Sequence, residues 1–394
     1  MTARLHPTIV RMATAHMAVD GYGNIYAPLL PLLIPRLDLS LAMAGAFAML
    51  FQLAASVSQL GFGHLADRWR PRLLLIAGPF LAVTVLSLVG ISTSRVMLGA
   101  ILMCGGLGTA AFHPPAAALA HRLGGARAGL AMSVYISGGT VGLAMGPLVF
   151  APFVERFGVM WTPVLALPGL AVVTAFARNV PSFHLNHGHQ GGGLTALRPY
   201  ARPLALLYSI VVFRTLTSLA IATFVPVLLT QHGMSVGAAG YNVSVYLFSS
   251  GLGGFLGGPI ADRFGARRVI IMSLLLATPF LVAAPALHGV WFTIALSIGG
   301  FFLQSTLPVN VTFGQAIAPV SAATVSSLMM GFAWGTGGLA VPLVGMLADR
   351  IGIERTLMLL SLVPLVAAIA ALPLPRTLAR APERGKSVSV PLVQ

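Results

Sequence analysis

His16-Met-Ala-Val-Asp20-Gly-Tyr-Gly-Asn24-Ile-Tyr26 is a stretch inside the first long apolar segment of the chain. It contains Asp20, the one carboxylate well within an expected membrane span, where a charge costs several kcal/mol unless it is paired, hydrated or neutralised. His16, Asp20 and Asn24 recur every four residues, which predicts a polar stripe on one helical face. We expect this stripe to face a protein cavity, because lipid cannot satisfy it. The simpler alternative is an aspartate that only locks one helix to another.

The composition indicates an integral membrane protein. Of 394 residues, 57% are hydrophobic and only 8% are charged, whereas a soluble domain carries about 25% charged residues. A spanning helix needs about 20 apolar residues, and little of the chain remains for a soluble catalytic domain. Twelve segments meet this requirement: 8–35, 40–66, 72–92, 95–121, 126–153, 159–179, 203–230, 236–261, 268–288, 290–318, 322–348 and 354–374.

The net charge of +15 is distributed unevenly between the loops. Such an asymmetry is the positive-inside pattern of membrane proteins and argues against a nucleic-acid partner. It predicts that both termini are cytoplasmic. The basic residues cluster in alternate loops: Arg68, Arg70 and Arg72; Arg122 and Arg127; Arg178, Arg198 and Arg202; Arg263, Arg267 and Arg268.

The two halves of the chain repeat each other. Gly63-His-Leu-Ala-Asp67-Arg68 recurs as Gly258-Pro-Ile-Ala-Asp262-Arg263, 195 positions further on. The same shift carries Pro147 to Pro342, and Glu155-Arg-Phe-Gly158 matches Asp349-Arg-Ile-Gly352 with one residue deleted. Parallel six-helix repeats of this kind are typical of secondary transporters, whose substrate site lies between the halves near the bilayer midplane.

We therefore predict an all-α membrane protein with twelve transmembrane helices in two pseudo-symmetric six-helix bundles. The N-terminal bundle occupies residues 1–180, and a Gly-rich cytoplasmic linker follows at 181–201. The C-terminal bundle occupies 202–375, and 376–394 form a cytoplasmic tail. Gly142, Gly146 and Pro147 in the fifth span, like Gly258 in the eighth, predict close helix packing. Such seams would also let one half rock against the other.

Several motifs resemble those of a known family. The segment from Gly63 to Arg68 with Arg72, and its copy around Asp262-Arg263, are similar to the cytoplasmic loop motif of the major facilitator superfamily. Gly142-Leu-Ala-Met-Gly146-Pro147 is similar to that superfamily's antiporter motif. More narrowly, the chain resembles the fosmidomycin-resistance efflux proteins. The landmarks of this resemblance are His16-xxx-Asp20, Phe51-Gln52-Leu53, Gly106-Leu-Gly108, Phe112-His113-Pro114, Gly129-Leu-Ala, Gly258-Pro259, Gln315 and Gly345-Met-Leu-Ala-Asp349.

The resemblance implies a major facilitator fold, alternating access and proton-driven export of small, often anionic compounds. Two departures matter. After Phe112-His113-Pro114 and after Gln315 the efflux family usually has a glutamate, and here Pro115 and Ala316 stand at those places. If those carboxylates carry protons or bind substrate in relatives, coupling here depends more heavily on Asp20.

Arg214 is the only strong cation deep in an expected span. The shift of 195 carries Asp20 to Thr215, beside Arg214, so we predict that the two charges face each other across the cavity. A purely structural ion pair is the alternative. His113 precedes Pro114-Pro115 and suits proton transfer or an anion contact, unless it only satisfies a carbonyl that proline frees. His16 is positioned to tune Asp20 from one turn away.

Other polar residues can orient a small polar substrate or simply bridge helices. The charged motif residues Asp67, Arg68, Arg72, Asp262 and Arg263 predict a latch that holds the cytoplasmic side shut, with plain topology signalling as the alternative. The polar residues at membrane depth are Asn24, Tyr26, Gln52, Tyr135, Asn242, Tyr246, Gln304, Asn310 and Gln315.

The sequence thus predicts a proton-coupled transporter of the bacterial inner membrane that exports a small polar or anionic drug or metabolite by antiport. Asp20 would carry the proton, and Arg214 and His113 would contact the anion. If deprotonated Asp20 neutralises Arg214, however, its protonation frees Arg214 for an anion, and uptake by symport remains an alternative. A membrane scaffold or intramembrane enzyme is the alternative of another class.

We expect no enzymatic activity and no cofactor beyond the proton gradient, because phosphate-loop, nucleophile and zinc-protease motifs are absent. Three linker histidines, His184, His187 and His189, lack a cysteine or carboxylate to complete a metal site. The expected partners are the small-molecule substrate, protons and the lipid bilayer, and we expect a monomer.

Overall fold

The computed structural model describes residues 6–68, 70–181, 183, 195–319 and 322–375. Every regular element in these ranges is helical. Short 3₁₀ turns and one π-helical turn, Leu328–Phe332, join the α-helices. The α-helices are α1 (Pro7–Gly23), α2 (Tyr26–Leu37), α3 (Leu41–Ser56), α4 (Ser58–Arg68), α5 (Pro71–Leu86), α6 (Arg95–Gly124), α7 (Ala128–Phe157), α8 (Ala166–Ala177), α9 (Ala201–Gln231), α10 (Val236–Phe264), α11 (Ala266–Ala283), α12 (Val290–Ile317), α13 (Ala322–Ser327), α14 (Ala333–Leu339), α15 (Val341–Ile351), α16 (Ile353–Leu360) and α17 (Val363–Ala370).

In the described chain, eleven helical segments are long and apolar enough to cross a membrane. The remaining predicted span, 8–35, is broken at Asn24 and Ile25 into α1 and α2. Pro28 explains the break, because it has no N–H to donate to the carbonyl of Asn24. The prediction of one continuous first helix is therefore wrong, and Asn24 ends α1 instead of continuing the stripe of His16 and Asp20.

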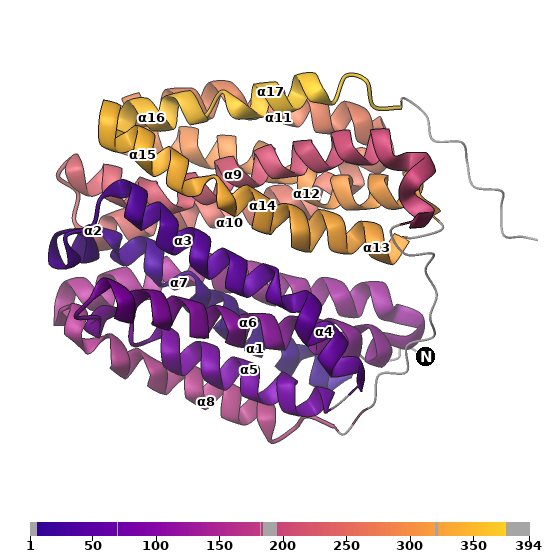
Figure 1. The fold of residues 1–394 in the computed structure, drawn as a ribbon, viewed down its shortest axis with the longest axis horizontal. Helices are drawn as coiled ribbons and strands as arrows, with labels where there is room; N and C mark the ends of the chain where they lie inside the picture. Colours follow the sequence, from indigo (N-terminus) through magenta and orange to yellow (C-terminus); the bar gives the residue numbers. More distant parts are fainter. Residues whose placement is uncertain (1–5, 69, 182, 184–194, 320–321, 376–394) are drawn as a thin grey trace, which may run out of the picture.

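The helices form two groups in Figure 1. The N-terminal half contains α1–α8 and the C-terminal half contains α9–α17. Within the halves, α1 packs on α7 and α10 packs on α12; between them, α10 packs on α7 and α15 on α3. The predicted all-helical membrane fold is confirmed.

Glycines allow α7 to approach α1 closely. A Cβ atom on Gly142 would overlap the backbone of Met17, and one on Gly146 would meet the carbonyl of Gly21. The predicted close packing is therefore present, but this seam lies inside the N-terminal half and not between the halves. Gly258, in contrast, has open space where a Cβ would lie.

The charged motif residues lie at helix ends, where the described contacts are few. The Nε atom of Arg72 donates to the carbonyl of Val180 at 3.2 Å. The side chain of Asp67 lies outside the described residues, as do the linker histidines and the tail. The predicted latch therefore stays a prediction. The other charged motif residues, all exposed, are Arg68, Asp262 and Arg263.

Candidate functional site

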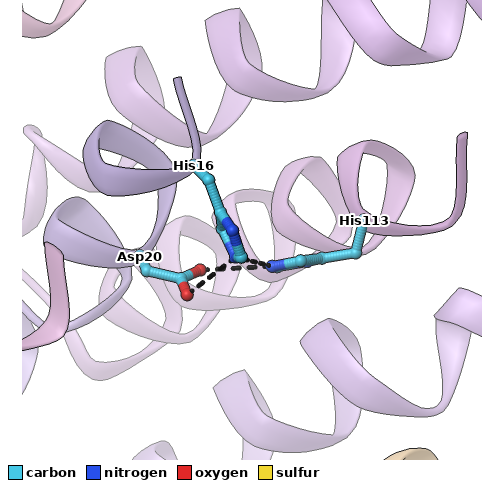
Figure 2. A group of neighbouring side chains, drawn as sticks. All are labelled: His16, Asp20 and His113. Atoms are coloured by element: carbon cyan, nitrogen blue, oxygen red, sulfur yellow. Dashed lines mark hydrogen bonds and ion pairs between the residues drawn. The ribbon is translucent and has the colours of Figure 1, made fainter. Parts of the chain in front are cut away.

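Asp20 contacts two histidines from different helices, and the three side chains meet at one point (Figure 2). Its Oδ2 atom is 3.1 Å from Nε2 of His16, one turn earlier on α1, and its Oδ1 atom is 3.3 Å from Nε2 of His113 on α6. The two Nε2 atoms are themselves 3.0 Å apart. The Asp20 and His113 side chains keep 17% and 20% of their surface exposed, so the cluster is not sealed inside the protein.

Backbone carbonyls determine which nitrogen of each histidine carries hydrogen. Nδ1 of His16 lies 2.8 Å from the carbonyl oxygen of Tyr135, and Nδ1 of His113 lies 2.9 Å from that of Thr109. A carbonyl oxygen only accepts, so both Nδ1 atoms are donors. Each neutral imidazole then presents a bare Nε2 atom to the cluster.

The cluster consequently requires a proton of its own. With both histidines neutral and Asp20 ionised, two bare nitrogens and a carboxylate would meet at 3.0–3.3 Å without a donor between them. One added proton supplies a donor: on Asp20 it makes one hydrogen bond, and on His16 Nε2 it can be shared between Asp20 Oδ2 and His113 Nε2. The three side chains, which come from two helices, are therefore close enough to share one proton.

Two residues of α7 shape this site. The ring of Tyr135 stacks on that of His16 with centroids 4.3 Å apart. Gly139 lies against the cluster, and a Cβ there would be 2.5 Å from His16 Nε2 and 2.6 Å from Asp20 Oδ2. Gly139 was not predicted from the sequence, where nothing distinguishes it from the other glycines of α7.

Arg214 lies in the C-terminal half, fully buried on α9. Its Nη1 atom donates to Oε1 of Gln304, its Nη2 atom donates to Oγ1 of Thr215 at 3.0 Å, and its guanidinium carbon is 5.5 Å from the centroid of the Trp334 ring. Its Nε atom has no partner in the described chain. Gln304 also donates to Ser218 Oγ at 3.1 Å.

Among the described residues the structure records no ion pair between Asp20 and Arg214, and the prediction that they face each other across a cavity stays a prediction. Among the described residues, the ion pairs of Asp20 are with His16 and His113, and the recorded partners of Arg214 are neutral. The Asp20 cluster belongs to the N-terminal half and the buried cation to the C-terminal half. The repeat predicts equivalent positions for Asp20 and Arg214 in the two halves. His113 lies next to Asp20, however, and provides a partner for its carboxylate within the N-terminal half.

The sequence profile of the Major Facilitator Superfamily matches residues 12–186 and 206–394. The chain belongs to the Major Facilitator Superfamily. It is thus a multi-pass membrane transporter.

Curated relatives cover nearly the whole chain. A fosmidomycin resistance protein of Escherichia coli (strain K12) is 28% identical over 367 residues, which are 90% of this chain and 89% of that protein. The uncharacterized MFS-type transporter YfnC of Bacillus subtilis (strain 168) is 28% identical over 385 residues, 93% of each. The predicted resemblance to the superfamily and to the fosmidomycin-resistance proteins is confirmed.

Solved structures agree on the fold. A bacterial homolog to the human lysosomal transporter Spinster, in an inward-facing and unoccupied conformation, has a TM-score of 0.76 at 18% identity and covers 92% of this chain and 95% of that chain. The nucleoside transporter NupG has a TM-score of 0.76 at 15% identity, with 94% and 99% covered. At these identities the likeness shows the major facilitator fold alone.

Several residues predicted to bind substrate form hydrogen bonds within or between helices. The side-chain amide of Asn24 donates to the carbonyl oxygen of Leu143 at 2.9 Å. The hydroxyl of Tyr26 donates to the carbonyl oxygen of Ala44 at 2.9 Å. These contacts favour the structural alternative for these residues. Others bond within or between helices of one half: Gln52 to Ser56, Asn242 to Ala238 and Thr293, Tyr246 to Ser218, and Gln315 to Ser326.

Two predicted residues keep unused polar atoms. Both amide atoms of Asn310 are buried without a partner in the described chain, as is the hydroxyl of Tyr135. Tyr135 contacts the cluster through its ring and its carbonyl, and the contact of its phenol with a substrate stays a prediction.

The cluster of His16, Asp20 and His113 is also the one group of described residues whose spacing could hold a metal ion, with ligand atoms within 4.8 Å of one another. Tetrahedral bonds of about 2.0–2.1 Å would separate such atoms by about 3.3 Å. The Nε2 atoms are 3.0 Å apart and lie 3.1 and 3.3 Å from the Asp20 oxygens, and the same spacing suits hydrogen bonds around a shared proton.

Proposed function

We propose that this transporter is a proton-coupled antiporter of a bacterial inner membrane that exports a small anionic drug or metabolite by alternating access, with both termini cytoplasmic. The His16–Asp20–His113 cluster carries the proton, and Arg214 binds the anion. The single observation behind the proposal is that two Nε2 atoms and a carboxylate meet at 3.0–3.3 Å, an arrangement that has no donor until a proton is added. Its partial exposure supports exchange of that proton with an access path.

The surroundings of Arg214 support an anionic substrate. A fully buried guanidinium with only neutral partners among the described residues is an incomplete site, because charges at membrane depth are normally paired. A carboxylate or phosphate-like group can pair with Arg in bidentate geometry, with Gln304 and Thr215 beside it. Binding of the anion would supply the missing charge.

The location of the two sites in different halves favours antiport over symport. The case for symport rested on Asp20 neutralising Arg214, and these residues have separate partners. Because Asp20 does not neutralise Arg214 directly, binding of the proton and binding of the anion are linked only through movement of the halves. Each can therefore bind while the other site is empty. The name of the Escherichia coli relative, a resistance protein, supports the outward direction.

The test uses purified protein in proteoliposomes with a trapped pH-sensitive dye. Fosmidomycin is the first probe, followed by a panel of carboxylates and phosphate esters. Antiport predicts that probe and protons move in opposite directions, and movement in the same direction would establish symport instead. Asp20→Asn is expected to abolish proton movement while the probe still raises the melting temperature. Asp38→Asn is the matched control, because Asp38 is exposed and pairs with Arg95. Wild-type proton flux in Asp20→Asn would remove the cluster from the mechanism.

A further inference from the structure

Two carboxylates reach from one half of the transporter to the start of a helix in the other. Asp349, near the end of α15, accepts from the backbone N–H groups of Leu41 and Ala42, both at 2.9 Å. Glu155, near the end of α7, accepts from the N–H group of Gly237 at 2.5 Å and from the Ser235 hydroxyl at 3.1 Å. Each acid therefore caps a helix, α3 or α10, that belongs to the opposite half.

These two contacts join the halves. Together they comprise four hydrogen bonds between described residues of the N-terminal and C-terminal halves. They lie at one end of the molecule, which we name the clasp end and define by the turns at 38–40, 158, 232–235 and 352.

The two contacts are related by the internal repeat. The shift of 195 positions carries Ala42 to Gly237, so the capped N–H groups are equivalent. Glu155 corresponds to Asp349 once the single deletion between the repeats is counted. The arrangement therefore has the approximate two-fold symmetry expected of two parallel repeats.

The packing beside each acid repeats as well. A Cβ on Gly45 would lie 2.8 Å from the carbonyl oxygen of Val341 and 2.9 Å from Cα of Pro342. A Cβ on Gly240 would lie 2.8 Å from the carbonyl oxygen of Pro147. The shift of 195 carries Gly45 to Gly240 and Pro147 to Pro342, so the two glycine–proline contacts are equivalent. Backbone thus approaches backbone at both places, and the halves are held in close contact.

We propose that Glu155 and Asp349 are two equivalent clasps that hold the clasp end shut, and that both must leave their helices when the transporter opens there. A carboxylate at a helix N-terminus is stabilised by the unpaired N–H groups and the helix dipole, and it can be released without breaking a covalent or a deeply buried contact. The inference rests on alternating access in the proposed function, but it does not depend on which ion drives transport or on Asp20.

The chain offers matched controls at the same end. Asp38 binds Arg95 at 3.0 Å, and both residues belong to the N-terminal half. Glu354 lies 3.5 Å from His232, and both belong to the C-terminal half. Neutralising either acid removes a negative charge from the clasp end without touching a contact between the halves.

The experiment measures the distance between spin labels across the clasp end by double electron–electron resonance, without substrate or pH gradient. The labels are attached to Thr93→Cys and Val290→Cys in a Cys104→Ser background, since both positions are exposed and lie in different halves. Glu155→Gln and Asp349→Asn are each expected to raise the open-to-closed ratio by about fivefold, and the double variant by about 25-fold. Asp38→Asn and Glu354→Gln should match the wild type.

Hydrogen exchange supplies a local readout in the same proteins. Asp349→Asn should accelerate exchange most at the amides of Leu41 and Ala42, and Glu155→Gln most at Gly237, with a smaller increase at the opposite clasp because the open population rises. Glu155→Asp and Asp349→Glu keep the charge, so we expect them to retain most of the closed population and to show that loss of folding does not explain the effect.

An unchanged distance distribution in the double variant would overturn the proposal, even if the local amides exchange faster. Equal opening by Asp38→Asn or Glu354→Gln would also overturn it, because the effect would then be a general response to charge. If the clasp variants open the clasp end as expected but the transporter shows no proton flux, the result would contradict only the proposed coupling at Asp20.

Discussion

Gly139→Ala tests whether the proton cluster needs the space that this glycine leaves. The added Cβ would lie 2.5 Å from His16 Nε2 and 2.6 Å from Asp20 Oδ2. Ordinary contact begins at 3.4 Å, so His16 or the methyl group must move by 3.4 − 2.5 = 0.9 Å. His16 has little freedom to move, because its ring stacks on Tyr135 and its Nδ1 atom is bonded to the Tyr135 carbonyl.

The expected effects on stability and on transport differ in size. Overpacking costs about 1–3 kcal/mol, and replacing glycine by alanine inside a helix returns about 1 kcal/mol. The net destabilisation is therefore small, about 0–2 kcal/mol. A displacement near 1 Å in a reacting group can reduce its rate about 100-fold. Proton-coupled transport should fall by about that factor while the protein remains folded.

Transport driven by an imposed pH gradient in proteoliposomes is the assay, with thermal unfolding of the same preparations. Gly129→Ala is the matched control, because Gly129 is on the same helix and has open space at its Cβ position. It should transport like the wild type and be slightly more stable. Wild-type transport by Gly139→Ala at every gradient would refute the view that the three side chains must keep their positions.

Two further substitutions test the buried groups. Arg214→Gln should weaken binding of an anionic probe at least tenfold in a thermal-shift titration. The unliganded variant should be as stable as the wild type, because the substitution removes a buried charge that has only neutral recorded partners in the described chain. An unchanged affinity would exclude Arg214 from the site. Tyr135→Phe should keep transport and raise the free energy of unfolding by about 1 kcal/mol, because the hydroxyl has no partner in the described chain. A large loss of transport in that variant would mean that the phenol itself contacts the substrate or the proton.

The positions of most helices followed from the sequence. The expected spans 236–261 and 290–318 compare with α10 at Val236–Phe264 and α12 at Val290–Ile317. This succeeds because a segment in lipid must satisfy its own backbone groups, so that hydropathy and length nearly determine a helix. The sequence analysis did not predict the break between α1 and α2, although Pro28 indicates it. Hydropathy remains high through this segment and does not report the hydrogen bond that proline cannot donate.

The sequence by itself also determined that Asp20 and His16 lie on one face, since a spacing of four residues is a property of a single helix. The repeat likewise determined the two related bundles. Tertiary structure alone decided that His113, 93 positions away, completes the cluster and that Arg214 does not. It also decided that Gly139 makes room for the cluster, and that Glu155 and Asp349 cap helices of the opposite half. Local sequence determines the hydrogen bonds within a helix, whereas the meeting of two helix faces depends on how many side chains pack together.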